Sequence, residues 1–406
     1  MLLQHEGPVT SASFSGDSRR VVTTDRADVG TSVVWNAKTG EMIGSPVSHT
    51  DSAFDAGFTS DGRNAISVGR GGDIIVQNAS GADTGPIIRK DDAPVDELAL
   101  SPTDPAIYAT GNYDGAIRLW RISEEEPLAT FHHSKRTTSL VFHPDGKHLA
   151  SSSQDGTARV WNIDLAKSVT EPLVSDAAIK WSVFSPDGTI LATANLDGTV
   201  VFWDWKSGTT VRTITRSTQQ SYLAFDATGQ HLIVAEARAG IANIWEVSQT
   251  TAPLWTLSHP GIRRVDYHPK QSMALSAGGR GAVQKASYAR LWDTSAGLPL
   301  TAPLIHSAPV DYATFSPDGT AAVTAAEDGT ARIWSLEPTP HGIETLRDFV
   351  ALLTGTRFRN DRTLSVSPAE QQKVFGQLRD QSGDDSVPEA ALKNRWATLR
   401  ELSKGS

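Results

Sequence analysis

The chain has 406 residues, a formal net charge of −9 and no cysteine. The acidic balance argues against a generic nucleic-acid surface, which would be basic, and the lack of cysteine excludes disulfides and thiolate metal sites. No apolar run approaches the roughly 18 residues of a membrane-spanning helix, and residues 1–8 lack the features of a signal peptide. We therefore expect a soluble, cytoplasmic protein that binds neither nucleic acid nor a membrane.

Tryptophan recurs along the chain at intervals of about 42 residues, which is typical of a repeat architecture. The recurring positions, with glutamine at the second, are Trp35, Gln77, Trp120, Trp161, Trp203, Trp245, Trp292 and Trp334. An Asp-Gly pair precedes several of them, as in Asp155-Gly156 and Asp328-Gly329. Eight copies of one pattern predict eight structural units, each too small to be stable without its neighbours.

The last repeat shows the predicted strands most clearly. Residues 311–315, 321–326 and 331–334 read as three short strands, separated by a Ser-Pro-Asp-Gly turn and an Asp-Gly hairpin. Earlier repeats add a fourth extended run, such as residues 297–305. Four short strands per unit predict an antiparallel meander, and a ring of such sheets would bury both faces of each.

These motifs resemble the WD40 repeat family in its bacterial form, through Phe-Ser-Pro-Asp-Gly and Asp-Gly-Thr-Ala-Arg-x-Trp. The resemblance covers about residues 1–336 and implies an all-β, eight-bladed propeller of four-stranded antiparallel blades over residues 1–340. In that family a His, a Ser or Thr, an Asp and a Trp form a hydrogen-bonded chain within a blade. The matching positions are His133, Ser151, Asp155 and Trp161, and again His306, Thr324, Asp328 and Trp334.

Five repeats depart from this set of four residues. Ser175 replaces His in the fifth repeat, Ala235 and Ala239 replace the hydroxyl and the carboxylate in the sixth, and Gln77 replaces Trp in the second. The first and seventh repeats have longer hairpins. We expect these blades to rely mainly on apolar packing, and the insertion in the seventh repeat to project as a loop.

The end of the repeat region predicts how the ring closes. Pro338 and Pro340 follow the last tryptophan and oppose a regular ladder strand there. Residues 2–5 align with residues 304–306, which end the preceding fourth strand. We therefore expect residues 1–5 to complete the last blade, and the shortness of that strand points to a piece of a longer chain.

Residues 341–406 show a different periodicity, with apolar residues at helical spacing from Ile343 to Leu353. Ser367-Pro368-Ala369-Glu370 is a capping box that opens a second helix, and a third is expected from Pro388. The apolar stripes favour a helical extension that caps the propeller over one that docks a partner or self-associates. Such tails resemble those that follow WD40 repeats in multi-domain bacterial proteins, some of them kinases, but kinase motifs are absent here.

The sequence nominates no catalyst, cofactor or metal site. His132 and His133 are adjacent in a predicted strand and should point to opposite faces. The Gly-rich runs 69–72 and 278–281 precede no predicted helix, so they lack the dipole of a phosphate loop. The other histidines that we considered lie in or near surface turns, without a paired carboxylate at ligand spacing: His143, His148, His231 and His268.

The pattern instead indicates a binding surface. In WD40 propellers a partner usually meets the top face, at the start of each first strand and just before the hairpin aspartate. The positions that fall there, and that should face water, are Phe54, Asp55, Asp96, Glu97, Tyr113, Lys180, Trp181, Leu196, Tyr222, Arg238, Arg263, Arg264, Asp311, Tyr312 and Glu327. Acidic members come from the second and third repeats and basic members from the fifth to seventh, so a charge-split face would orient a peptide.

We therefore predict a non-enzymatic scaffold, with a monomer favoured, that binds a protein or an extended peptide on this face. Two alternatives stay open. The chain is a regulatory fragment of a larger signalling protein, such as a kinase-linked one, or it binds a small ligand or acts as an enzyme at the mouth of the central channel.

Overall fold

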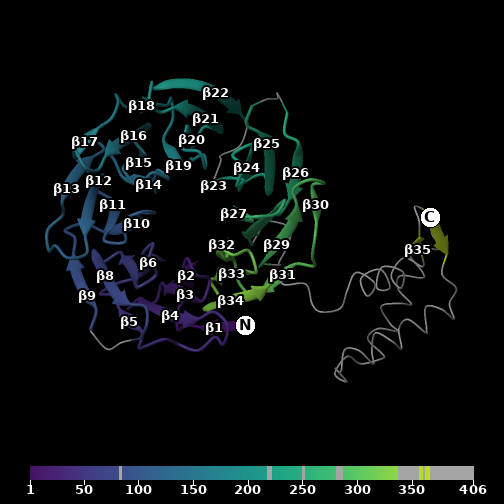
Figure 1. The fold of residues 1–406 in the computed structure, drawn as a ribbon, viewed down its shortest axis with the longest axis horizontal. Coiled ribbons are helices and arrows are strands. Elements are labelled where there is room, and N and C mark those ends of the chain that lie inside the picture. The colour runs from purple at the N-terminus through teal and green to yellow at the C-terminus, as the bar shows by residue number, and fades with distance from the viewer. Residues whose placement is uncertain are drawn as a thin grey trace. The chain divides into compact units, whose positions relative to one another are not determined.

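The computed structural model describes residues 1–81, 85–216, 222–248, 252–279 and 287–336, together with the backbone of residues 356–359 and 362–365. Residues 1–336 form one compact unit and residues 337–406 a second. In the first unit, eight antiparallel sheets are arranged as a ring (Figure 1). The predicted all-β propeller with eight four-stranded blades is confirmed.

Seven blades present their strands in sequence order from the centre of the ring outward, and blade 8 does so for its first three strands. The first strands are β2 (Val9–Phe14), β6 (Ala53–Phe58), β10 (Val95–Leu100), β14 (Thr137–Phe142), β19 (Ile179–Phe184), β23 (Tyr222–Phe225), β27 (Ile262–Tyr267) and β32 (Val310–Phe315). They begin blades 1 to 8 in that order. The second strands are β3 (Arg20–Asp25), β7 (Asn64–Gly69), β11 (Ile107–Asn112), β15 (His148–Ser153), β20 (Ile190–Asn195), β24 (His231–Glu236), β28 (Met273–Gly278) and β33 (Ala321–Ala326).

The third strand carries the recurring tryptophan in every blade but the second, which has Gln77. The third strands are β4 (Thr31–Asn36), β8 (Asp73–Asn78), β12 (Ala116–Arg121), β16 (Thr157–Asn162), β21 (Thr199–Asp204), β25 (Ile241–Glu246), β29 (Ser287–Asp293) and β34 (Thr330–Ser335). The outer strands are β5 (Val47–Ser48), β9 (Ile87–Lys90), β13 (Ala129–His132), β17 (Lys167–Ser168) with β18 (Leu173–Val174), β22 (Thr209–Thr215), β26 (Trp255–Ser258), β30 (Leu298–Pro299) with β31 (Leu304–His306), and β1 (Leu2–Gln4).

The apolar core lies between blades rather than within them. Eight hydrophobic clusters each combine side chains of two neighbouring blades, as Leu140 and Phe142 of blade 4 pack with Ile117 of blade 3. Because every blade buries both faces against neighbours, the stability of the ring depends on interfaces that run around it without interruption.

The N-terminal strand joins the two ends of the ring. β1 pairs with β34 in antiparallel register, with Leu2 opposite Arg332 and Leu3 opposite Ala331. The His5 backbone N–H also donates to the Gly329 carbonyl over 2.9 Å, and the Leu3 side chain is fully buried. The outer strand of blade 8 therefore comes from the opposite end of the chain.

The second unit contains a hairpin that the sequence pattern does not predict. β35 (Thr356–Arg359) pairs with β36 (Arg362–Ser365) in antiparallel register. The helices expected at residues 343–353, after Ser367 and after Pro388 lie outside the described residues.

Blades 4 and 8 contain hydrogen-bonded chains at the positions that the resemblance implies. In blade 4 the Trp161 Nε1–H donates to Ser151 Oγ over 2.8 Å, and His133 Nε2 lies 2.8 Å from the same oxygen. The Thr157 hydroxyl donates to Asp155, so the Nδ1–H of His133 donates to Thr157 Oγ1 at 3.0 Å, and Nε2 accepts from the serine hydroxyl. Asp155 Oδ2 lies 3.4 Å from the same Nδ1. Blade 8 repeats this arrangement through His306, Thr324, Asp328 and Trp334.

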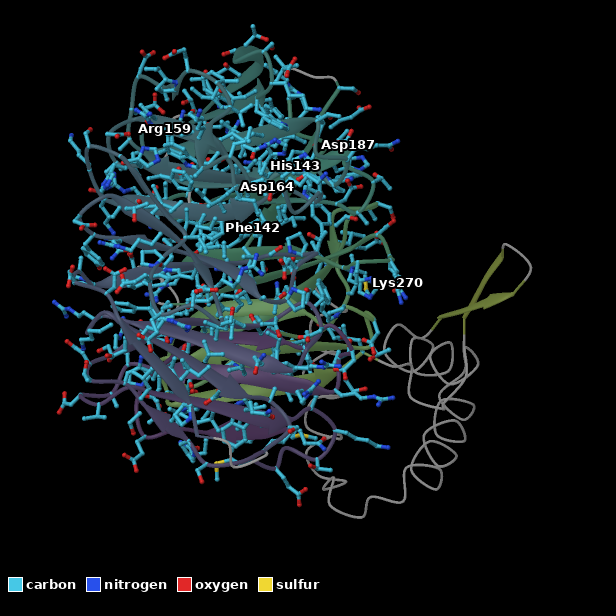
Figure 2. The ribbon with its side chains drawn as sticks, turned by 60° about the vertical axis from the view of Figure 1, so that its left-hand side comes forward. Phe142, His143, Arg159, Asp164, Asp187 and Lys270 are labelled. Atoms are coloured by element: carbon cyan, nitrogen blue, oxygen red, sulfur yellow. The ribbon has the colours of Figure 1, made fainter. Side chains whose placement is uncertain are left out.

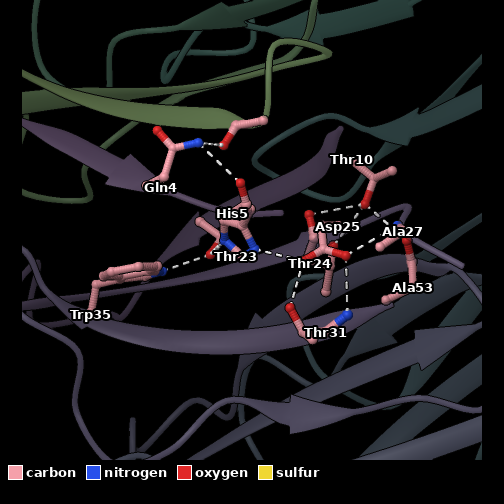
Figure 3. Close-up of polar contacts among 11 residues, drawn as sticks. Gln4, His5, Thr10, Thr23, Thr24, Asp25, Ala27, Thr31, Trp35 and Ala53 are labelled. Atoms are coloured by element: carbon pink, nitrogen blue, oxygen red, sulfur yellow. Dashed lines mark hydrogen bonds and ion pairs between the residues drawn. The ribbon is translucent and has the colours of Figure 1, made fainter. Parts of the chain in front are cut away.

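The expectation that blade 1 relies mainly on apolar packing is wrong. Trp35 Nε1 donates to Thr23 Oγ1 over 2.7 Å, and the His5 ring bridges Thr23 and Asp25 at 2.6 and 2.7 Å (Figure 3). Asp25 ends the second strand instead of sitting in the hairpin, and the Thr31 hydroxyl also donates to it. The full chain of four groups is thus present with the carboxylate at a different position.

Two other departing blades replace some of the missing groups with polar contacts of their own. In blade 7, His259 and Trp292 both contact Ser276 Oγ, at 2.6 and 2.7 Å. In blade 6, the buried Glu236 pairs with Arg216 across 3.0 Å. Among the described residues, the buried Trp245 Nε1 of blade 6 has no hydrogen-bond partner.

Candidate functional site

The predicted top-face residues divide into two groups, because the first strands line the centre of the ring. Four are exposed: Tyr113, Lys180, Leu196 and Arg238. The others are half-buried, contrary to the prediction that they face water: Phe54, Asp55, Asp96, Glu97, Trp181, Tyr222, Arg263, Arg264, Asp311, Tyr312 and Glu327. Neighbouring first strands converge on the channel, and their side chains cover one another there.

Arg264 is at the centre of an aromatic cluster in this channel. Its Cζ lies 3.8 Å from the ring centroid of Tyr312, 4.6 Å from that of Tyr222 and 5.4 Å from that of Trp181. These four residues come from blades 5 to 8. Stacking of a guanidinium on aromatic faces is favourable, more so away from water. Trp181 and Arg264 therefore hold four blades together at the channel and are not free contact residues.

A cavity of about 310 Å³ lies beside this cluster. Trp181, Tyr222 and Arg264 line one part of it, and Asp266 and Thr314 another. Asp266 accepts hydrogen bonds from the Thr314 hydroxyl at 2.7 Å and from a backbone N–H at 2.9 Å. The cavity therefore presents one cation, aromatic faces and a carboxylate whose lone pairs are partly occupied.

The acidic side of the channel is formed by Asp55, Asp96 and Glu97. The Ser11 hydroxyl donates to Asp55 over 2.8 Å, and Arg136 forms an ion pair with Asp96. Burial raises the pKa of Glu97 well above its usual value, and the negative charges of Asp96 and Asp55 raise it further. The channel therefore carries less negative charge than three free carboxylates would.

The predicted charge split across the face is weaker than the sequence pattern indicated. Arg263 pairs with Asp311 and, across 3.0 Å, with Glu327. These three predicted contact residues thus satisfy one another between blades 7 and 8. The cations that remain accessible among the predicted positions are Lys180 and Arg238.

We call the four exposed residues Tyr113, Lys180, Leu196 and Arg238 the exposed rim. Tyr113 is 44% exposed and Leu196 38%, and both lie in turns between second and third strands. The Arg136 guanidinium lies 3.9 Å from the Tyr113 ring centroid and covers one face of that ring. Burial raises the pKa of Asp96, and the positive charges of Arg136 and Lys180 oppose that rise. The rim thus combines apolar and cationic groups from blades 3, 5 and 6.

A second cluster lies on the opposite face, which carries the turns between first and second strands. His143 and His148 flank such a turn in blade 4, and both contact Asp145 at 2.9 Å. The expectation that these histidines lack a paired carboxylate is wrong, and it is wrong for His231, which contacts Asp226 at 3.0 Å. The run Phe-His-Pro-Asp-Gly-Lys-His carried the signal, because histidine replaces the serine of the repeat there.

Comparison with known proteins identifies the repeat. The family described as WD domain, G-beta repeat matches residues 125–162, 170–204 and 301–335, which include the third strands of blades 4, 5 and 8. These three segments therefore match the WD40 repeat. A relative in Schizosaccharomyces pombe, "Target of rapamycin complex subunit wat1", is 42% identical over 79 residues, or 19% of this chain and 24% of the relative.

Two further relatives and one structure extend the comparison. "Target of rapamycin complex subunit LST8" of Saccharomyces cerevisiae is 30% identical over 168 residues, 39% of this chain and 54% of that protein. "Pre-mRNA-processing factor 19" of Bos taurus is 35% identical over 83 residues, 20% of this chain and 16% of that protein. These relatives are eukaryotic and do not support the predicted bacterial form. The computationally designed Ika8 protein shares the fold, with a TM-score of 0.67 and 22% identity over 82% of this chain and 98% of its own.

Proposed function

We propose that this WD40 propeller is a non-enzymatic scaffold that binds a protein or an extended peptide through the exposed rim. The exposed rim itself is the observation that carries the proposal. Tyr113 and Arg238 are of the residue types in which interface hot spots are enriched, and Leu196 adds an exposed apolar group. The relatives named as subunits of a complex support the same class of function. A cytoplasmic location and a monomeric state are parts of this proposal, and a regulatory role within a larger signalling protein stays a prediction.

Charged side chains around the channel would set the direction in which a partner lies across the proposed surface. Lys180 and Arg238 favour acidic groups of a partner at blades 5 and 6, whereas the Asp55, Asp96 and Glu97 side attracts basic groups. A partner that spans the face would thus be oriented by charge and held by apolar contacts at Tyr113 and Leu196. Binding strength would come from several shallow contacts, because the half-buried side chains already satisfy one another.

The test is affinity capture from the cytoplasm of the source cells with the full chain, followed by measurement of Kd with the purified partner. The double variant Tyr113→Ala/Leu196→Asp removes the apolar part of the rim. Lys270→Glu, an exposed change on the opposite face, is the control. A partner that binds wild type and control but binds the rim variant at least about tenfold more weakly supports the proposal, since hot-spot residues each contribute that much.

Equal binding to all three proteins would refute the role of the rim. Loss of binding only after deletion of residues 341–406 would move the function to the second unit. The melting temperature of each variant must match that of wild type, which the exposure of both substituted side chains leads us to expect.

A small-ligand function is the second candidate, because the 310 Å³ cavity presents the Arg264 guanidinium to an anionic group. Isothermal titration with small mono- and dicarboxylates tests it. Saturable binding that Arg264→Met abolishes, while the fold is retained, would favour this candidate over the scaffold. If wild type and Arg264→Met give the same heat of binding, or if neither gives any, the small-ligand function is refuted.

A further inference from the structure

Three potential metal ligands meet at the turn between β14 and β15 of blade 4. His143 follows the last residue of β14, His148 is the first residue of β15, and Asp145 lies in the turn between them. His143 Nδ1 lies 2.9 Å from Asp145 Oδ1, and His148 Nδ1 lies 2.9 Å from Asp145 Oδ2. One ligand atom from each residue can be chosen so that all three lie within 4.8 Å of one another. In a tetrahedral zinc site, bonds of about 2.0–2.1 Å place neighbouring ligand atoms roughly 3.3 Å apart, so small side-chain shifts suffice.

The second ring nitrogen of His143 defines its tautomer. Nε2 lies 2.9 Å from the carbonyl oxygen of Gly188 in blade 5, so this nitrogen must carry a proton and donate. In neutral His143, Nδ1 then keeps its lone pair, which the Asp145 backbone N–H contacts at 3.1 Å. Histidines that bind metals usually donate their other N–H to a carbonyl or carboxylate in this way. In neutral His143, the Nδ1 lone pair faces the Asp145 carboxylate with no proton between the two atoms. A cation bound here would lie between Nδ1 and the carboxylate and would accept the lone pair of Nδ1.

Aromatic packing and the hairpin hold the ligands in place. The centroid of Trp205 lies 5.3 Å from that of His143 and 5.1 Å from that of His148, and the Trp205 Nε1–H also donates to the Gly188 carbonyl at 2.7 Å. Phe184 also contacts His143, with centroids 5.0 Å apart, and its ring lies 5.9 Å from that of Trp205. Backbone bonds from His143 to His148 and from Gly146 to His143 close the turn. The Asp145 side chain is 36% exposed, so an ion can reach the cluster from solvent.

The equivalent turns of other blades lack this combination. In blade 7, His268 makes the same bond to the next blade, from Nε2 to the Gly319 carbonyl at 2.9 Å, but Lys270 occupies the position of Asp145. In blade 6, Asp226 and His231 form a single carboxylate–imidazole pair. Figure 2 shows Asp187 of blade 5 and Lys270 of blade 7 toward the right-hand side of the propeller. His268 shows that a histidine can make the bond between two blades without an aspartate or a second histidine beside it. The bond from His143 to blade 5 therefore does not explain why Asp145 and His148 are present.

We propose that His143, Asp145 and His148 form a zinc site. Two imidazole nitrogens and one carboxylate leave a fourth, solvent-facing position, the donor set and openness that Zn²⁺ accepts. The site lies at the far end of the six-residue strand β14 from Arg136, which contacts Tyr113 of the exposed rim, and at about 3.3 Å per residue that strand spans about 20 Å. Metal binding here is therefore independent of the proposed scaffold function.

The experiment titrates Zn²⁺ into the full chain, freed of metal by a chelator, in competition with a chromophoric zinc indicator. His148→Ala and Asp145→Asn each remove one ligand, and Asp145→Asn preserves the shape of the side chain. His231→Ala is the matched control, because it removes an imidazole paired with one carboxylate at the equivalent strand start of blade 6. Melting curves in excess chelator verify that each variant is folded.

We expect one equivalent of Zn²⁺ to bind wild type and His231→Ala equally. Both ligand variants should bind at least about tenfold more weakly, since even groups that only support a ligand change affinity by that much. Binding that is the same in wild type and Asp145→Asn would overturn the proposal, as would absence of binding to wild type. An equal loss in His231→Ala would also overturn it, because the ion would then not be held at blade 4.

Discussion

The buried indole nitrogens of blades 4 and 6 allow one hydrogen bond to be weighed within the same fold. Trp161 Nε1 donates to Ser151 Oγ at 2.8 Å, whereas the Trp245 Nε1 has no partner among the described residues. Both side chains are almost fully buried and lie at equivalent positions of their third strands. Replacement of each by phenylalanine removes the same atoms, so the cost of the space left behind is similar in both.

The two substitutions should differ in the free energy of unfolding. Trp161→Phe loses a hydrogen bond worth about 0.5–1.5 kcal/mol, while Trp245→Phe relieves an unpaired buried N–H that costs about 1–3 kcal/mol. We therefore expect Trp161→Phe to be the more destabilising by about 1.5–4.5 kcal/mol.

Equilibrium unfolding in urea, followed by tryptophan fluorescence and by circular dichroism, measures this difference. Both probes must give the same transition, because a ring of eight blades unfolds in two states only if its interfaces are cooperative. Equal free energies for the two variants, or a larger loss for Trp245→Phe, would refute the assignment of the hydrogen-bonded chain as a source of stability.

Three more predictions concern pH and ring closure. Burial lowers the pKa of His133 and of His306 to about 4, so the unfolded chain takes up protons between about pH 6.5 and 4 that the folded chain does not. The urea concentration at the unfolding midpoint should therefore fall as pH drops through this range. His133→Gln should make this fall smaller. Because burial raises the pKa of Glu97, the stability that this protonated side chain contributes is lost as pH rises. The melting temperature of Glu97→Gln should therefore equal that of wild type at pH 4 and be higher than that of wild type at pH 8. Deletion of residues 1–5 removes the buried Leu3 and the His5 bonds, so calorimetry should show a lower and broader melting transition; an unchanged transition would mean that β1 is dispensable.

The fold was largely predictable because its determinants are local and repeated. An Asp-Gly hairpin and a tryptophan recur at one interval, and each copy reports the same pair of strands. The chain of four groups in blade 1 was not predictable by position matching, because Asp25 lies at the end of a strand and still reaches His5. A carboxylate at another backbone position can accept the same hydrogen bonds, and the expected motif is then missing from the sequence although the contacts are present.

The candidate site was predictable only as a set of positions. Register along a first strand tells which residues approach the channel, and Tyr113 and Leu196 are exposed as expected for turns. It does not tell how side chains from several blades pack once they meet. Arg264 lies against rings of three other blades, and Arg263 pairs with two acids of blade 8, although all were expected to face water.

The pairing of β1 with β34 sets a long interval during synthesis. Leu3 leaves the ribosome more than 300 residues before its partner Ala331. At about 5–20 residues per second, roughly 15–65 s pass before the two can meet. During that time the outer edge of the first-made segment is unpaired and its leucine is in water. A nascent chain that stops before blade 8 cannot close its ring, so truncated products should expose this edge to chaperones and proteases.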